Sequence, residues 1–153
     1  MFFIPFFKSF LYPPRQGFEV GTSTTMHDVI IIGAGPAGLE ASLTLSRFCR
    51  PHLVISIPKL CRNDKALNMH GYLGSDGTPP LEFMKQARVE LDEYGFANFV
   101  DGRVVSTTRA GKTFKVKLED GIQYTGRKLI IASGSMDILL PVDGTFTCVT
   151  SLT

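Results

Sequence analysis

A chain of 153 residues with 44% hydrophobic and 20% charged residues can bury one core, and its composition is that of a globular domain. The formal net charge of +2, without a basic run, excludes an electrostatic basis for nucleic-acid binding. The three cysteines, Cys49, Cys61 and Cys148, form neither a CxxC pair nor a metal-ligand spacing. We therefore expect structural thiols in a reducing, cytoplasmic compartment and no metal site.

The N-terminal segment, residues 1–25, differs from the rest of the chain. It carries five of the twelve phenylalanines within its first ten residues and is interrupted at Pro13-Pro14. It is too short to span a bilayer as a helix, and it lacks the basic region and cleavage site of a secretory signal. We interpret it as a disordered or mis-assigned leader, exclude it from the fold, and expect no membrane association.

Hydrophobic patterns then predict two strands with a helix between them. Residues 29–32 are a continuous β-branched run, which is typical of a central parallel strand buried on both faces. Residues 39–49 have apolar side chains at roughly helical spacing, and Pro51 ends that helix. Residues 53–57 indicate a second buried strand. Together these elements form a βαβ unit.

A long, turn-rich connection follows over residues 58–80, and connections of this length usually serve a function. Thr78 is placed to cap the next helix, with Pro79 at its first position. We expect this helix to cover residues 81–94 and to end at Gly95.

The remaining residues favour strands. Residues 103–108 and 113–118 flank a turn sequence and predict a hairpin, and residues 122–125 and 128–132 predict two further short strands. With a strand expected between the second helix and the hairpin, this order predicts an α/β fold. We expect a Rossmann-like parallel sheet that carries an antiparallel β-meander.

The chain's principal motif is GxGxxG, formed by Gly33, Gly35 and Gly38 directly after the first predicted strand. In this motif the first glycine permits a tight turn, the second lets a pyrophosphate approach the backbone, and the third allows close helix–strand packing. Free amides at the helix N-terminus then hold phosphate oxygens. Because a strand precedes the motif and a helix and strand follow it, the sequence predicts nucleotide binding.

Two stretches carry a resemblance to a known family. GAGPAGLEA, residues 33–41, resembles the FAD site of the thioredoxin-reductase-like disulfide oxidoreductases, flavoproteins with two dinucleotide-binding domains. CRN at residues 61–63 and NMHGYLGSDGTPP at residues 68–80 are similar to a loop in one branch of that family. That branch includes thioredoxin-reductase-like proteins of fungi and bacteria and dithiol oxidases of fungal epidithio natural products. The resemblance covers about residues 27–143.

The resemblance implies FAD as the cofactor and assigns its contacts position by position. The implied contacts are Gly33, Ala34, Gly35, Pro36, Ala37 and Gly38 around the pyrophosphate; Arg62, Asn63 and His70 along the ribityl and flavin side; the Val104 backbone near the adenine; and the turn of Ala132, Ser133 and Gly134 against the cofactor.

Several polar residues have alternative interpretations. His70 contacts the cofactor side in the family, but it could instead hydrogen-bond within its own glycine-rich loop. Asp76, in an Asp-Gly pair, is interpreted as a turn former rather than a catalytic base. His27 and His52 fall at strand edges, so we expect them on the surface. No catalytic residue is assigned in this chain.

One position departs from the family pattern. An Asp or Glu is expected at the end of the second strand, where it binds ribose hydroxyls. Here that position is Ser56, in VISIP, and no acid is close by in this stretch. A serine hydroxyl can bind a ribose, but it lacks the charge-assisted strength of a carboxylate. We therefore expect FAD to be held less firmly than in the family.

The family reaction transfers hydride from NAD(P)H through FAD to a disulfide, or oxidises a dithiol, in a small molecule or protein. It requires a second Rossmann domain, usually a CxxC dithiol, and a C-terminal return to the FAD domain. This sequence matches only the first part of that architecture. We interpret residues 26–143 as the N-terminal part of an incomplete FAD-binding domain and residues 144–153 as a divergent tail.

We accordingly expect a truncated FAD-dependent oxidoreductase that is not competent alone. Two alternatives stay open: an FAD- or nucleotide-binding module without turnover, and a non-functional fragment. For the full-length form, the resemblance implies a homodimer.

Overall fold

A computed structural model of the chain describes residues 26–57, 63 and 66–135. The interpretations of the leader, of the tail from residue 144, of Arg62 and of Cys61 and Cys148 lie outside the described residues. The elements, in chain order, are β1 (Met26–Ile32), α2 (Pro36–Arg47), β2 (His52–Ser56), α3 (Pro80–Tyr94), β3 (Ala97–Asp101), β4 (Val104–Ala110), β5 (Thr113–Leu118) and β6 (Gln123–Ile131).

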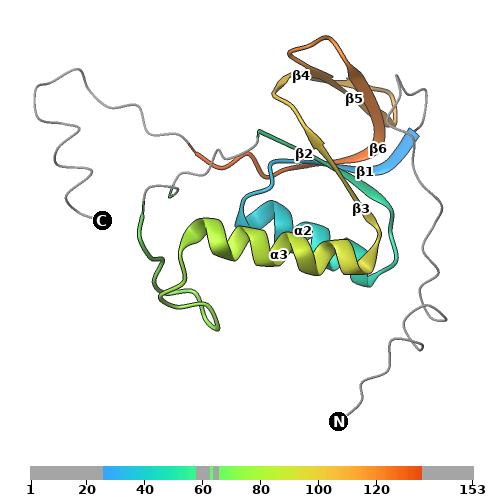
Figure 1. Ribbon diagram of the computed structural model, residues 1–153. Helices are drawn as coiled ribbons and strands as arrows, with labels where there is room; N and C mark the ends of the chain where they lie inside the picture. The colour runs from blue at the N-terminus through green and yellow to red at the C-terminus, as the bar shows by residue number, and fades with distance from the viewer. Residues whose placement is uncertain (1–25, 58–62, 64–65, 136–153) are drawn as a thin grey trace, which may run out of the picture.

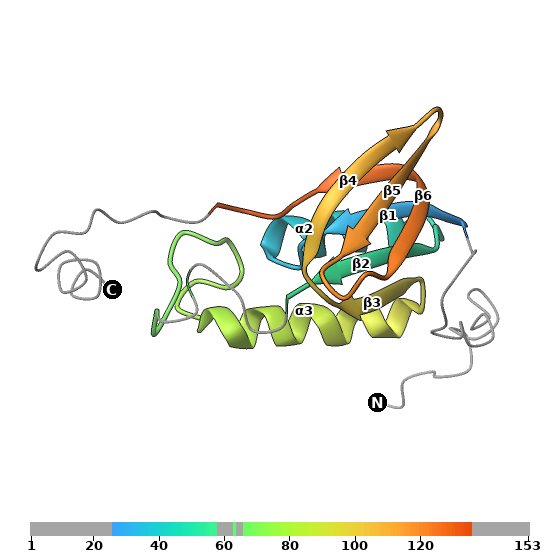
Figure 2. The ribbon, with the colours of Figure 1, turned by 90° about the horizontal axis from the view of Figure 1, so that it is seen from above.

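The strands form one six-stranded sheet in the order β3-β2-β1-β6-β5-β4. β3, β2, β1 and β6 run parallel, whereas β5 is antiparallel to β6 and to β4. Helices α2 and α3 lie side by side against one face of the parallel strands, and the β4–β5 hairpin curls over the other face (Figures 1 and 2). The predicted α/β, Rossmann-like sheet with a β-meander is confirmed.

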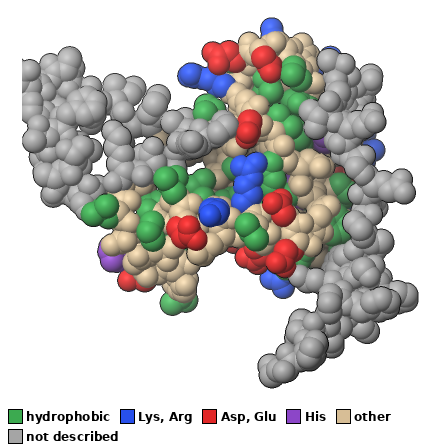
Figure 3. Space-filling view, in the orientation of Figure 1, with side chains coloured by type: hydrophobic (Ala, Val, Ile, Leu, Met, Phe, Trp, Pro, Cys, Tyr) green, Lys and Arg blue, Asp and Glu red, His purple; other side chains and the backbone are tan. Residues whose placement is uncertain are grey.

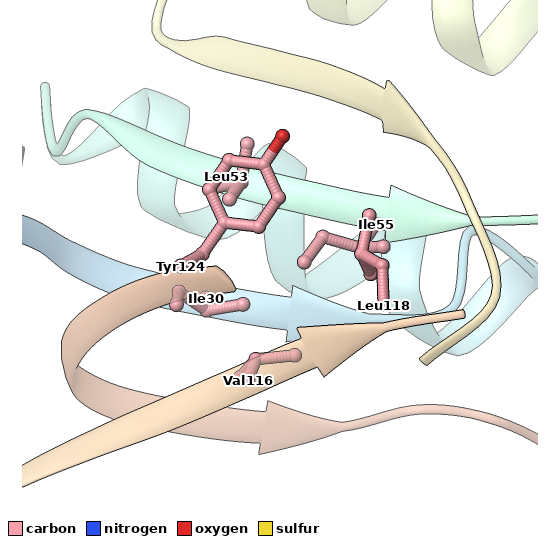
Figure 4. Packing of buried hydrophobic residues seen from close by; sticks show 6 residues of the cluster. All are labelled: Ile30, Leu53, Ile55, Val116, Leu118 and Tyr124. Carbon is pink, nitrogen blue, oxygen red and sulfur yellow. The ribbon is translucent and has the colours of Figure 1, made fainter. Parts of the chain in front are cut away.

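The parallel strands are buried on both faces because successive side chains of a strand point in opposite directions. Ile31 of β1 and Val54 of β2 face the helices, where they pack with Leu39 and Leu91. We call this cluster the helix-side core. The neighbours of these residues along β1 and β2 face the opposite way and form a second cluster, the meander-side core. In Figure 4 the side chains of β1 and β2 converge with those of β5 and β6; these are Ile30, Leu53, Ile55, Val116, Leu118 and Tyr124.

Strand β6 is one continuous strand, where the sequence pattern predicted two short strands. Its first half pairs with β5, and most of its length pairs with β1. The residues between the two predicted segments interrupted the apolar pattern. Gly126 faces Ile30 at a point where a Cβ would lie 2.8 Å from the Ile30 Cγ1 atom, and Arg127 donates to the Asp28 carboxylate at 2.5 Å. Both residues therefore suit a strand that lies against β1.

The start of α3 also differs from our expectation. Thr78 is not the N-cap: the cap is Pro79, and no side chain caps the helix. Pro80 occupies the first helical position, where its missing N–H costs nothing. The backbone of Thr78 belongs to the preceding loop, since its carbonyl accepts from the Met69 amide at 2.9 Å. At the other end, Gly95 has φ +69 and ends the helix as predicted.

The expectation that His27 and His52 lie on the surface is wrong, because both are buried. His52 Nδ1 donates to the Arg50 carbonyl oxygen at 2.8 Å, so its Nε2 accepts from the Ser42 hydroxyl at 2.6 Å. This pair joins α2 to β2 within the core. Burial lowers the pKa of both histidines, although for His52 the bond to Arg50 opposes the shift.

Cys49 is not the structural, core-like thiol that we expected. It is exposed and follows α2 with φ +54, a left-handed conformation that allows the next amide, that of Arg50, to bond the Leu45 carbonyl oxygen at 2.9 Å. The chain there turns away from the helix, which carries the side chain to the surface.

We expect the thermal midpoint of unfolding to fall as the pH is lowered from about 7.5 to about 5.5. The folded-state pKa of His52 and of His27 lies below 6.5, so the unfolded chain takes up protons first. This stabilisation is fully present above pH 6.5 and is lost as the pH falls toward the folded-state pKa. Thermal unfolding followed by circular dichroism measures the slope.

The variant His52→Gln should have a shallower slope, because the contribution of His52 is removed while that of His27 remains. The matched control is His70→Gln, since His70 is exposed and outside the core. An unchanged slope in His52→Gln would contradict the role assigned to the buried imidazole.

Candidate dinucleotide-binding site

The candidate site lies at one edge of the sheet. Because β1, β2, β3 and β6 are parallel, their carboxyl ends meet at that edge. The glycine loop leaves β1 there, Ser56 ends β2, Asp101 ends β3, and residues 132–134 follow β6. In open α/β sheets, ligands bind in the crevice outside these ends.

Gly33 makes the tight turn that the motif predicts. Its φ is +103, a conformation that favours glycine. Its amide donates to the Ile55 carbonyl oxygen at 2.8 Å, and a Cβ at this position would collide with the carbonyl oxygen of Ala132. Gly33 therefore lies tightly between β2 and the segment that follows β6.

Gly38 is required by packing in the first turn of α2. A Cβ there would collide with the Gly33 carbonyl oxygen and would lie 3.5 Å from the Ala132 Cβ. Gly38 is buried, as is Ala34, which joins the helix-side core. The third glycine thus seats the helix on the loop, as the motif predicts.

Gly35 is different, because nothing in the described part of the fold requires a glycine there. Its φ of −73° and ψ of −177° are extended values that any residue adopts. An added Cβ would meet no atom within 4 Å. Gly35 is also the N-cap of α2, so its missing side chain leaves the start of the helix uncovered.

The start of α2 is suited to an anion. Pro36 occupies the first turn, no acidic residue lies in that turn, and no side chain caps it. The Leu39 amide bonds the Gly35 carbonyl at 2.9 Å, so the amides of Ala37 and Gly38 precede the first intrahelical bond. Unpaired amides at a helix start carry partial positive charge and bind phosphate.

The turn after β6 lies against the glycine loop. The Ala132 amide donates to the Ile32 carbonyl oxygen at 2.8 Å, which continues the pairing of β6 with β1. The Ser133 amide nitrogen lies 3.1 Å from the position that a Gly33 Cβ would take. Ser133 is exposed, and Gly134 has φ +68. The structure thus brings this predicted turn and the glycine motif together.

Beside the loop, Ser56 is half-buried at the end of β2, and Asp101 is its register partner on β3. The Gly102 amide donates to the Ser56 carbonyl oxygen at 2.9 Å, which ties the two strand ends together. Val104 begins β4 and packs partly against the meander-side core. The sequence reasoning missed Asp101, because only the sheet order places it next to β2.

The loop over residues 66–79 is organised by its own contacts. Asp76 accepts from the Gly71 amide at 2.7 Å and from His70 Nδ1 at 3.4 Å. The Gly71 amide, and then His70, lower the pKa of the exposed Asp76 carboxyl below its ordinary value. These contacts agree with the interpretation of Asp76 as a turn former. They also agree with the intra-loop alternative for His70, while its contact with a cofactor stays a prediction; Asn63 is exposed.

Figure 3 shows acidic and basic side chains interspersed over the face that α3 covers, with hydrophobic side chains gathered near the start of α3. Leu67, Leu73 and Leu81 are exposed in this part of the chain.

In the described part of the chain, no helix has both the length and the apolar character needed to cross a bilayer. Among residues 26–57, 63 and 66–135, no three His, Cys, Asp or Glu side chains gather in a way that suits a metal ion.

Comparison with known proteins agrees with this fold. The sequence profile of the family described as pyridine nucleotide-disulphide oxidoreductase matches residues 27–153. A thioredoxin reductase of Claviceps purpurea is 34% identical over 128 residues, which cover 80% of this chain and 39% of that protein. A thioredoxin reductase of Aquifex aeolicus is 36% identical over 119 residues, which cover 73% of this chain and 35% of that protein.

A crystal structure of an oxidoreductase from Agrobacterium tumefaciens superposes with a TM-score of 0.75 at 35% identity. The match covers 80% of this chain and 41% of that chain. The chain therefore spans about two fifths of the length of the proteins it matches.

We expect alanine substitutions to separate the roles of two glycines. Gly38→Ala should lower the free energy of unfolding by about 1–3 kcal/mol or more, because the added methyl group collides with the Gly33 backbone. Gly35→Ala should stay within about 0.5 kcal/mol of the wild type, because its Cβ meets open space. Urea denaturation followed by circular dichroism measures both; equal losses would contradict the assignment.

Proposed function

Because this chain belongs to the pyridine nucleotide-disulphide oxidoreductase family and is similar to thioredoxin reductases, we propose that it binds FAD at the glycine loop. The residues that would hold the pyrophosphate are those from Gly33 to Gly38, with the amides of Ala37 and Gly38 as the donors. This assignment makes the chain the part of a thioredoxin-reductase-like oxidoreductase that binds the flavin nucleotide.

The observation that carries the proposal is the open surface at Gly35. Gly33 and Gly38 are explained by contacts within the described fold, but Gly35 has an ordinary extended backbone and no neighbour to avoid. A glycine in such a place is explained by a group that must approach the backbone closely. The uncapped, acid-free start of α2 supplies positive partial charge at the same point, so an anionic pyrophosphate fits both features.

The remaining contacts are proposed from the resemblance to the family. Ala132, Ser133 and Gly134 lie against the glycine loop and would line the cofactor, while the backbone near Val104 would lie by the adenine. Arg62, Asn63 and His70 would lie along the ribityl and flavin side. With Nδ1 of His70 on Asp76, Nε2 is the ring nitrogen that would serve this contact.

Bound FAD would supply the two-electron chemistry of the family, in which hydride from NAD(P)H reduces a disulfide or a dithiol is oxidised. The 153-residue chain holds a single GxGxxG motif and no CxxC pair. We therefore propose that the 153-residue chain binds FAD but does not oxidise NAD(P)H. The wider reductase or oxidase activity, its disulfide or dithiol substrate and a homodimeric assembly are proposals for the longer architecture of the relatives.

The first test is FAD binding by the purified 153-residue chain, followed by quenching of flavin fluorescence during titration. We expect stoichiometric binding, and we expect Gly35→Ala to bind about tenfold or more weakly because the methyl group displaces phosphate oxygens from charge-assisted amide contacts. Thr107→Ala, on the exposed part of β4, is the matched control and should bind as the wild type does.

Three outcomes of this test have distinct meanings. A wild-type chain that folds and binds no FAD overturns the proposal. Binding without consumption of NADH or NADPH, read as absorbance loss at the nicotinamide band, supports the binding role. Binding with sustained NAD(P)H consumption overturns the expectation of no turnover and assigns the reductase activity to the chain itself.

A further inference from the structure

The end of β2 lacks the carboxylate that would receive a ribose. Ser56 occupies the strand end, and its hydroxyl carries no charge. A ribose diol has two hydroxyl donors, which a carboxylate can accept together through charge-assisted hydrogen bonds. The neighbouring strand β3 ends in an aspartate, Asp101, and the geometry of the two strand ends places it beside Ser56.

Register and strand alternation place Ser56 and Asp101 on the same face of the sheet. The parallel pairing sets Val54 opposite Phe99 and Ser56 opposite Asp101. Val54 and Phe99 both pack in the helix-side core, and residues two positions further along each strand point to the same side. Since neighbouring strands lie about 4.8 Å apart, the hydroxyl and the carboxylate are adjacent groups at the strand ends.

The backbone around Asp101 is held in place. The Gly102 amide donates to the Ser56 carbonyl oxygen at 2.9 Å. Gly102 also packs closely against β5, since a Cβ added to it would lie 2.7 Å from the Leu118 Cδ1 atom. Asp101 is exposed at this anchored strand end. Its carboxylate is therefore accessible from a fixed position.

Ser56 and Asp101 also lie at the same end of the sheet as the glycine loop. Ile55, the residue before Ser56, accepts the Gly33 amide at 2.8 Å, so Ser56 follows directly after the residue that holds the loop. Asp101 lies one strand further along the same edge, in the order β1, β2, β3.

We propose that Asp101 supplies the carboxylate that binds the adenosine ribose hydroxyls, with the Ser56 hydroxyl as a second polar contact. The inference rests on the proposed nucleotide-binding function and adds a specificity residue to it. The family pattern has one carboxylate at the end of the second strand. In this chain the ribose would instead meet two groups, the Ser56 hydroxyl on β2 and the Asp101 carboxylate on β3. The negative charge also selects a free ribose diol over a ribose bearing a 2′-phosphate.

The test measures recognition of the diol separately from recognition of the phosphates. The 153-residue chain is titrated by calorimetry with ADP and with 2′,3′-dideoxyadenosine diphosphate, which has the same phosphates and base. We expect the wild type to bind ADP about tenfold more tightly than the dideoxy analogue, since hydrogen bonds to a charged group are lost. Asp101→Asn should weaken ADP binding and bring the affinity ratio close to one, and Ser56→Ala should reduce the ratio less.

Two control variants keep the outcomes distinct. Asp92→Asn removes an exposed carboxylate at the far end of α3 and should keep the wild-type ratio. Gly35→Ala should weaken both ligands equally, which also keeps the ratio. Because each ratio is measured within one variant, a partly unfolded sample lowers the stoichiometry and leaves the ratio unaffected.

A wild-type ratio that survives in Asp101→Asn overturns this inference and leaves the proposed function standing. A wild-type chain that binds ADP and the dideoxy analogue equally also overturns it, because no group then recognises the ribose hydroxyls. A wild-type chain that binds neither ADP nor FAD overturns the proposed function together with the inference.

Discussion

The close approach of three backbone segments at the end of β1 is the constraint on which the site depends. Gly33, the first turn of α2 at Gly38 and the residue after β6, Ala132, lie so near each other that a Cβ on either glycine would strike a carbonyl oxygen. Two contacts fix this arrangement, from the Gly33 amide to Ile55 and from the Ala132 amide to Ile32. The N-terminus of α2, the end of β2 and the turn after β6 are therefore positioned by main chain, which side-chain motion does not disturb.

Two buried cores support this junction. β1 and β2 are buried on both faces, by helices on one side and by the curled meander on the other. The Ser42–His52 bond adds a polar link between α2 and β2 inside the helix-side core, and burial lowers the pKa of that imidazole. A neutral His52 satisfies both of its ring nitrogens, one as a donor and one as an acceptor, so the buried pair requires no charge.

The candidate site combines positions that the fold requires with positions that it does not. Gly33 and Gly38 are needed to bring the chain together, whereas Gly35 and Asp101 leave an open backbone and an accessible carboxylate at the same edge. The proposed binding of a nucleotide rests on these two features, a glycine without a packing reason and a strand-end acid beside an uncharged Ser56. Local chemistry and sheet order together therefore define the proposed path of the dinucleotide along the strand ends, from β1 toward β3.

By itself the sequence determined the βαβ unit, the glycine turn and the stop of α3 at Gly95, because these depend on local periodicity and on glycines at fixed spacing. The resemblance to the family was also visible in the sequence, in the motif residues 33–41 and 68–80. The tertiary structure alone decided which polar residues are buried and which strand ends are neighbours. His52 was expected on the surface but is buried beneath α2. Asp101 is 45 positions from Ser56 in the sequence but pairs with it in the sheet. Burial and strand pairing arise from contacts between distant segments, so no local pattern around either residue carries that information.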